Sequence, residues 1–111
     1  MEAALKAIAE PRRREILRLV WDAERTAGDI ASHFDVSRPA ISQHLTVLRA
    51  AGLVNERRDG ARRLYLANRD ALERLQAELQ VFWSGSLARL KEEVEADEGR
   101  RSGRTHPDRQ R

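Results

Sequence analysis

The stretch from Ser37 to Val54, SRPAISQHLTVLRAAGLV, decides the fold of this chain. Ser37 is a favourable N-cap residue. Pro39 is tolerated in the first turn of a helix, because the N–H that it lacks has no helical partner there. Gly52 supplies the left-handed residue that commonly ends a helix. The stretch therefore predicts a helix that begins after Ser37 and ends near residue 51.

Two opposite faces of this helix differ in chemistry. One face is aliphatic and is expected to be buried, at Ile41, Leu45 and Leu48. The other carries small and amide side chains instead of the usual Lys and Glu, at Pro39, Ser42, Gln43, Thr46 and Ala50. Such a face can approach base edges in the major groove of DNA, where a Gln amide can bond adenine at two positions. Arg38 flanks this face as a candidate phosphate contact. His44 lies on the other flank, where a hydrogen-bonded, half-buried structural role is favoured over a contact with DNA.

A shorter helix is expected directly before this one. Thr26 is a suitable N-cap with Asp29 three residues on, and Ile30 and Phe34 share one face. Residues 35–36 then leave room only for a tight turn. Two helices joined in this way predict a helix-turn-helix, whose second helix enters the major groove.

Two further helices are expected nearer the N-terminus. A weak one spans about residues 2–9, with Leu5 and Ile8 as its apolar positions. The next begins at Pro11 and carries an apolar stripe of Ile16, Leu17, Val20 and Trp21. The arginines at 12–14 stand at a helix N-terminus, where cations are disfavoured. Phosphate contact and a purely structural role both remain open for them.

After Gly52 the apolar period changes from 3.6 to 2. Residues 53–58 and 61–67 flank Asp59-Gly60, a two-residue turn signal for a β-hairpin. Pairing around that turn sets Glu56 opposite Arg63. Four arginines surround the tip: Arg57, Arg58, Arg62 and Arg63. A solvated charge cluster is one interpretation, but the position after a helix-turn-helix favours a wing that contacts DNA.

A long helix is expected from about residue 69. Its apolar seam is longer than so small a domain can bury, so we expect a dimer helix in preference to a helix packed on its own core. On this helix the expected interface comprises Leu72, Leu75, Leu79, Phe82, Trp83, Leu87 and Leu90. Residues 84–86, Ser-Gly-Ser, could kink the helix. The expected domain is 1–95, followed by a disordered basic tail at 96–111.

Composition excludes several classes of protein. The 111 residues include no cysteine, which rules out disulfides and thiolate metal sites. With few histidines as well, neither a metal site, a cofactor nor a catalytic site is expected. The apolar runs are too short to span a membrane, so a cytoplasmic protein is expected. The net charge is only +3, but residues 12–67 hold eleven arginines against seven acidic residues. A basic module of this kind suits a polyanionic partner.

Together the segments LKAIAEPRRREILRLV and TAGDIASHFDVSRPAISQHLTVLRAAGLVNERRDGARRLYLA resemble the ArsR/SmtB family of winged helix-turn-helix regulators over about residues 5–95. The resemblance implies a homodimer formed by the first and last helices, which adds Leu5 and Ile8 of the first helix to the expected interface. It also implies repression relieved by an inducer, and DNA contacts at Ser37, Arg38, Ser42, Gln43 and the wing arginines. Metal-sensing relatives carry cysteines where this chain reads TAGDIA, or His and Asp pairs on the last helix. Here both are missing, which implies a metal-independent branch.

The sequence therefore predicts a mainly α fold with a small β-hairpin wing, homodimeric through its terminal helices. The expected function is sequence-specific binding of double-stranded DNA at a palindromic operator, as a repressor that could act on its own gene. The alternative is a winged-helix protein-interaction module without sequence-specific DNA binding. An enzyme and a double-stranded RNA binder fit the residues less well. The operator, the regulated genes and any inducer stay open.

Overall fold

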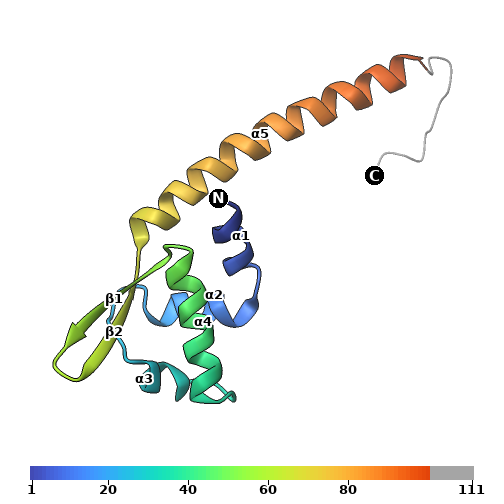
Figure 1. Ribbon diagram of the computed structural model, residues 1–111. Coiled ribbons are helices and arrows are strands. Elements are labelled where there is room, and N and C mark those ends of the chain that lie inside the picture. Colours follow the sequence, from blue (N-terminus) through green and yellow to red (C-terminus); the bar gives the residue numbers. More distant parts are fainter. Residues whose placement is uncertain (101–111) are drawn as a thin grey trace. The chain divides into compact units, whose positions relative to one another are not determined.

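The computed structural model describes residues 1–100, for Arg100 the backbone only. Residues 1–77 form one compact unit, and a second unit begins at Glu78. Within the described residues the elements are α1 (Glu2–Ile8), α2 (Pro11–Leu19), α3 (Ala27–Ala31), α4 (Arg38–Ala50), β1 (Val54–Asp59), β2 (Arg62–Ala67) and α5 (Arg69–Arg100) (Figure 1). The mainly α fold with one hairpin is as expected.

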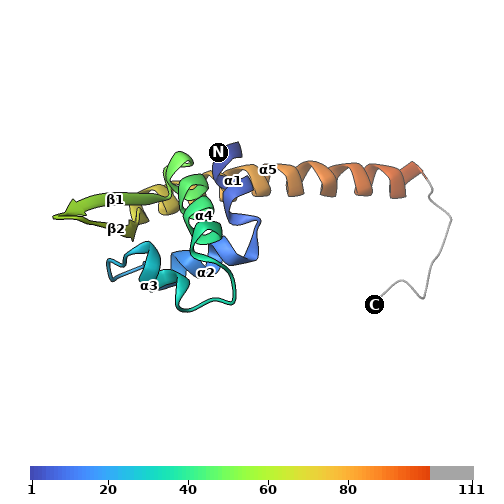
Figure 2. The same ribbon diagram turned by 60° about the horizontal axis from the view of Figure 1, so that its bottom comes forward.

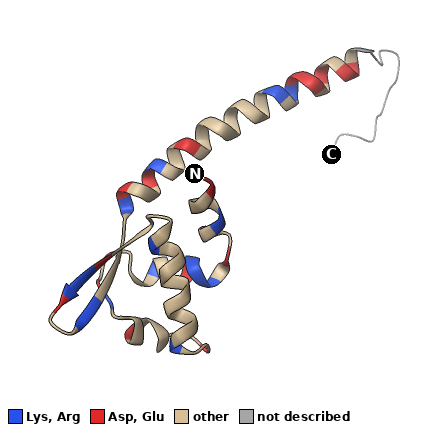
Figure 3. Cartoon of the chain, viewed as in Figure 1, with Lys and Arg blue, Asp and Glu red and all other residues tan. Residues whose placement is uncertain are grey.

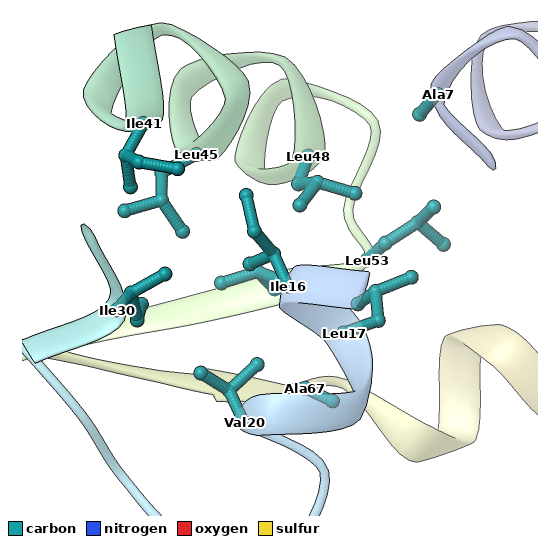
Figure 4. Close-up of a cluster of buried hydrophobic side chains, with 11 residues drawn as sticks. Ala7, Ile16, Leu17, Val20, Ile30, Ile41, Leu45, Leu48, Leu53 and Ala67 are labelled. Atoms are coloured by element: carbon teal, nitrogen blue, oxygen red, sulfur yellow. The ribbon is translucent and has the colours of Figure 1, made fainter. Parts of the chain in front are cut away.

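The helix α4 lies at the centre of the first unit. It contacts α1, α2, α3 and β1, and the two views of the ribbon show the hairpin beside it (Figures 1 and 2). Its aliphatic face is buried as expected, with Ile41 and Leu48 fully covered and Leu45 nearly so. In the close-up these side chains point toward α2 and toward Ile30 of α3 (Figure 4). The core therefore fixes which face of α4 remains available to a partner.

Side-chain caps set where the helices begin. The Ser37 hydroxyl accepts a hydrogen bond from the Ala40 N–H at 3.3 Å, and the Thr26 hydroxyl accepts one from the Asp29 N–H at 3.1 Å. At the other end of α4, Gly52 has a φ of 79°, which favours glycine. These local signals place the start of α3 and both ends of α4 where the sequence predicts. The end of α3 differs: the helix stops at Ala31, so Phe34 lies beyond it and the turn is longer than the expected residues 35–36.

The register of the wing differs from the prediction. Asp59 pairs with Arg62, so the turn comprises Gly60 and Ala61, and Glu56 lies opposite Tyr65. The expected turn at Asp59-Gly60 and the direct opposition of Glu56 and Arg63 are therefore wrong. Gly60 alone has a positive φ, 64°, which suits a turn of type II′ with Gly as its first central residue. Glu56 and Arg63 still meet diagonally, with Nε 3.4 Å from Oε2.

Two apolar residues lie elsewhere than expected. Trp21 lies beyond the end of α2, so it does not belong to the apolar stripe of that helix. Of its surface, 40% is exposed. The guanidinium of Arg69 covers its ring at 5.8 Å from the centroid. Leu75 was expected in a dimer interface, yet it is only 5% exposed within its own chain. Packing inside one protomer already accounts for Leu75.

The second unit consists of α5 from Glu78 onward. The helix continues through residues 84–86 without a break, so the possible kink is not observed. It also continues past residue 95 to Arg100, so the disorder expected from residue 96 is wrong for 96–100, whose residues include good helix formers. Residues 101–111 of the expected tail lie outside the described residues. No helix in the described part is long and apolar enough to cross a bilayer.

Candidate nucleic-acid interface

The outward face of α4 presents the side chains expected to read DNA. Ser42, Gln43 and Thr46 are all exposed. The Thr46 hydroxyl donates to the Ser42 carbonyl at 3.0 Å, so Thr46 can offer a partner its methyl group and the lone pairs of its oxygen, but not its hydroxyl proton. Among the described residues, the Gln43 amide has no hydrogen-bond partner, so both its donor and its acceptor are available. An unpaired amide on a helix face is suited to the paired donor and acceptor of an adenine edge.

An open hollow of about 510 Å³ lies between the wing and the starts of α3 and α4. It is lined by Thr26, Ala27, Gly28, Arg38, Ser42, Ala61, Arg62, Arg63 and Tyr65. The start of α4 thus contributes the guanidinium group of Arg38 to this concave surface, and the wing contributes those of Arg62 and Arg63. Such a surface can accept a strand of negatively charged backbone beside the exposed face of α4.

The position of Arg38 explains how α4 contributes charge to this hollow. Its guanidinium lies over Gly28 of α3, where a Cβ would be 3.6 Å from Cζ, an ordinary contact distance. Within residues 1–100 the side chain has no hydrogen-bond or ion-pair partner. Arg38 is therefore a free cation at the rim of the α4 face.

The four wing arginines do not share one environment (Figure 3 shows in blue where basic residues lie along the strands). Arg62 pairs with Asp59 at 2.9 Å within the hairpin, and Arg63 with Glu56. Arg58 has no partner among the described residues. These three exposed arginines remain on the wing surface, and the nearby carboxylates reduce their mutual repulsion.

Arg57 is bound differently, by Glu24 from the segment between α2 and α3. Nε donates to Oε2 at 2.8 Å and Nη2 donates to Oε1 at 2.6 Å. The hydrogen bond from Arg57 holds the pKa of the Glu24 carboxyl below its ordinary value, and the same bond raises the pKa of Arg57. Sequence reasoning missed Glu24, because nothing local relates residues 24 and 57.

The sequence leaves the role of the arginines at 12–14 open, and two of them have hydrogen-bond partners within the first unit. Arg13 donates to the carbonyls of Ala7 at 2.6 Å and Lys6 at 3.1 Å, and Arg14 donates to the carbonyl of Ile8 at 2.7 Å. They satisfy the C-terminal carbonyls of α1, where positive charge is favourable. His44 is half-buried, as expected, with Nδ1 3.4 Å from Nη1 of Arg13.

Comparison with known proteins identifies the class of this molecule. Residues 10–56 match the model of the bacterial regulatory protein family arsR. The transcriptional repressor SdpR of Bacillus subtilis is 42% identical over 73 residues, which are 66% of this chain and 81% of SdpR. The chain belongs to the arsR family. The expected ArsR membership is thereby confirmed, and the chain is a DNA-binding transcriptional regulator.

Solved structures agree with the fold of this ArsR-family regulator. A possible transcriptional regulator for arsenical resistance superposes with a TM-score of 0.68 at 43% identity, covering 81% of this chain and 94% of its own. A homodimeric winged helix-turn-helix DNA-binding domain of Mycobacterium bovis superposes with a TM-score of 0.61 at 34% identity, covering 75% and 77%. The winged helix-turn-helix fold is confirmed, whereas the individual contact residues stay predictions.

Proposed function

We propose that this ArsR-family regulator binds a two-fold symmetric operator as a homodimer and represses transcription from it. The promoter of its own gene is one candidate for such an operator. The observation that carries the proposal is the exposed face of α4 around Gln43, directly beside the basic hollow that Arg38, Arg62 and Arg63 line. A recognition helix reads bases, and a basic rim holds the backbone on either side of it.

The two kinds of contact are assigned to different residues. Gln43 and Ser42 read base edges, and the methyl group of Thr46 packs against a base. Ser37 and Arg38, at the start of α4, contact phosphates, as do Arg58, Arg62 and Arg63 on the wing. The free amide of Gln43 and the exposed guanidinium groups support this division, because specificity needs shaped contacts whereas phosphate binding needs only charge.

The homodimer rests on an uncovered apolar stripe of α5. The stripe comprises Phe82, Trp83, Leu87, Leu90 and Val94, which lie on one face of the helix at 100° per residue. In the single chain 45–60% of the surface of each of these residues is exposed. Leu79 is half-buried, and Leu5, Ile8 and Leu72 are partly buried in the first unit. A stripe of this kind is normally covered in solution, and the M. bovis relative is described as homodimeric. Two copies would present two recognition helices to two half-sites.

The regulator acts in the cytoplasm, without catalysis and without a metal effector. The relatives reported above are named as regulators of transcription. In the part of the chain that the structure describes, no three His, Asp or Glu side chains are grouped so that they could hold a metal ion. Since the chain also has no thiolate, release from DNA depends on another signal.

Selection of genomic fragments by the purified full-length protein, followed by sequencing, tests the proposed function. The expected result is enrichment of an inverted repeat whose half-sites lie about one helical turn apart. Affinity for that repeat should fall steeply as salt is raised. No enrichment, together with an affinity for DNA that does not depend on salt, would instead indicate a protein-interaction module.

A further inference from the structure

We propose that Glu24 is a positioning residue for the wing, and that Arg57 serves this attachment and does not contact DNA. The inference rests on the proposed function, because it concerns how the wing is presented to the operator. Glu24 lies between α2 and α3, and Arg57 lies on β1, 33 residues later. Their ion pair joins the wing to the helical part of the first unit.

The wing needs such an attachment because a two-stranded hairpin is only marginally stable by itself. One connection is made by the backbone, where Arg25 and Tyr65 of β2 exchange N–H···O bonds of 3.1 and 2.9 Å. Two ion pairs join β1 to the helical part, one between Glu56 and Arg49 of α4 and one between Arg57 and Glu24, and the Ala67 N–H of β2 donates to the Val20 carbonyl at 2.9 Å. Of the two ion pairs, the one with Glu24 lies nearer the tip of the hairpin, so it opposes motion of the outer part of the wing.

The geometry of the pair separates Arg57 from the other wing arginines. Both carboxylate oxygens of Glu24 are engaged, by Nε and by Nη2, in the bidentate arrangement that combines strength with direction. A phosphate could bond the remaining N–H groups of Arg57, on Nη1 and Nη2, but it could take the bidentate edge formed by Nε and Nη2 only by displacing two charge-assisted bonds. Arg62 and Arg63 line the hollow, whereas Arg57 is not among its lining residues.

An alternative reading makes the opposite prediction. If Arg57 were a phosphate contact that Glu24 merely neutralises, removing the Glu24 charge would strengthen DNA binding. If Glu24 positions the wing, the same change should weaken binding to the operator, since Arg62 and Arg63 are then held less well. Because the pair is exposed to solvent, which weakens ion pairs, we expect the loss of operator affinity to be about fivefold at most.

The variant Glu24→Gln, measured by fluorescence anisotropy on the selected operator, therefore decides between the two. Asp59→Asn is the matched control, because it removes an equal charge that pairs only within the hairpin. We expect weaker operator binding for Glu24→Gln and equal or stronger binding for Asp59→Asn. A gain of affinity in both variants would overturn the proposal.

Charge reversal provides a second test. Arg57→Glu alone should weaken binding, and the double variant Glu24→Arg, Arg57→Glu should return affinity to within about twofold of the wild type, because its net charge is unchanged and a pair can form again. If Arg57 contacts phosphate, the double variant should stay as weak as Arg57→Glu. That result would contradict the positioning role.

NMR relaxation of the free, full-length protein tests the attachment without DNA. The backbone amides of residues 54–67 should lose order in Glu24→Gln and keep it in Asp59→Asn. Unchanged order in Glu24→Gln would refute the attachment even if affinity falls. Conversely, a wild-type protein without sequence-specific affinity would refute the proposed function, while this measurement still reports on the wing.

Discussion

Replacing Gln43 by Ala should weaken operator binding without weakening the fold. The side chain is exposed and has no partner within the described residues, and Ala is the better helix former, so the change costs nothing in the folded protomer. A bidentate base contact is worth about 1–3 kcal/mol of discrimination. Both protomers carry the change, so the dimer should lose about 2–6 kcal/mol, which is at least about 30-fold in affinity.

Fluorescence anisotropy with the selected operator and with a scrambled duplex measures this loss. The scrambled duplex should be bound almost as well as by the wild type, because the phosphate contacts remain. Gln80→Ala is the matched control, since it removes an exposed amide from α5 instead of α4. Equal losses on both duplexes, or no loss on the operator, would refute the assignment of α4 as the helix that reads the bases.

Other changes separate the remaining roles. Arg62→Ala should weaken operator and scrambled DNA alike and lower the slope of log affinity against log salt by about one unit per protomer; an unchanged slope would argue against a phosphate contact. Leu90→Glu should shift the protein to monomer in sedimentation, because Leu90 is 55% exposed in the single chain and only a partner would bury the charge. Leu48→Ala should lower the free energy of unfolding in urea by about 2–5 kcal/mol, since this side chain is fully buried. Because the pKa of Glu24 is lowered in the folded protein, its pair with Arg57 should be intact at neutral pH and lost as the pH falls through that lowered pKa, which NMR titration of the carboxyl can follow.

The sequence alone determined the parts of this protein that depend on local signals. The caps at Ser37 and Thr26, the left-handed Gly52 and the aliphatic spacing of α4 predicted the helix-turn-helix and the exposed face with Gln43. These predictions succeed because a cap or a helical face involves residues within one or two turns of each other. The resemblance to the ArsR family drew on the same stretch.

The tertiary structure alone decided what depends on residues far apart in the chain. Moving the turn by one residue changed every pairing in the wing, and packing inside the protomer buries Leu75, which the sequence assigns to the dimer interface. The partners of Arg13 and Arg57 lie in other elements, so no period or composition indicates them. Wing arginines that look equivalent in the sequence have different partners, because packing places the carboxylate of Glu24 against only one of them.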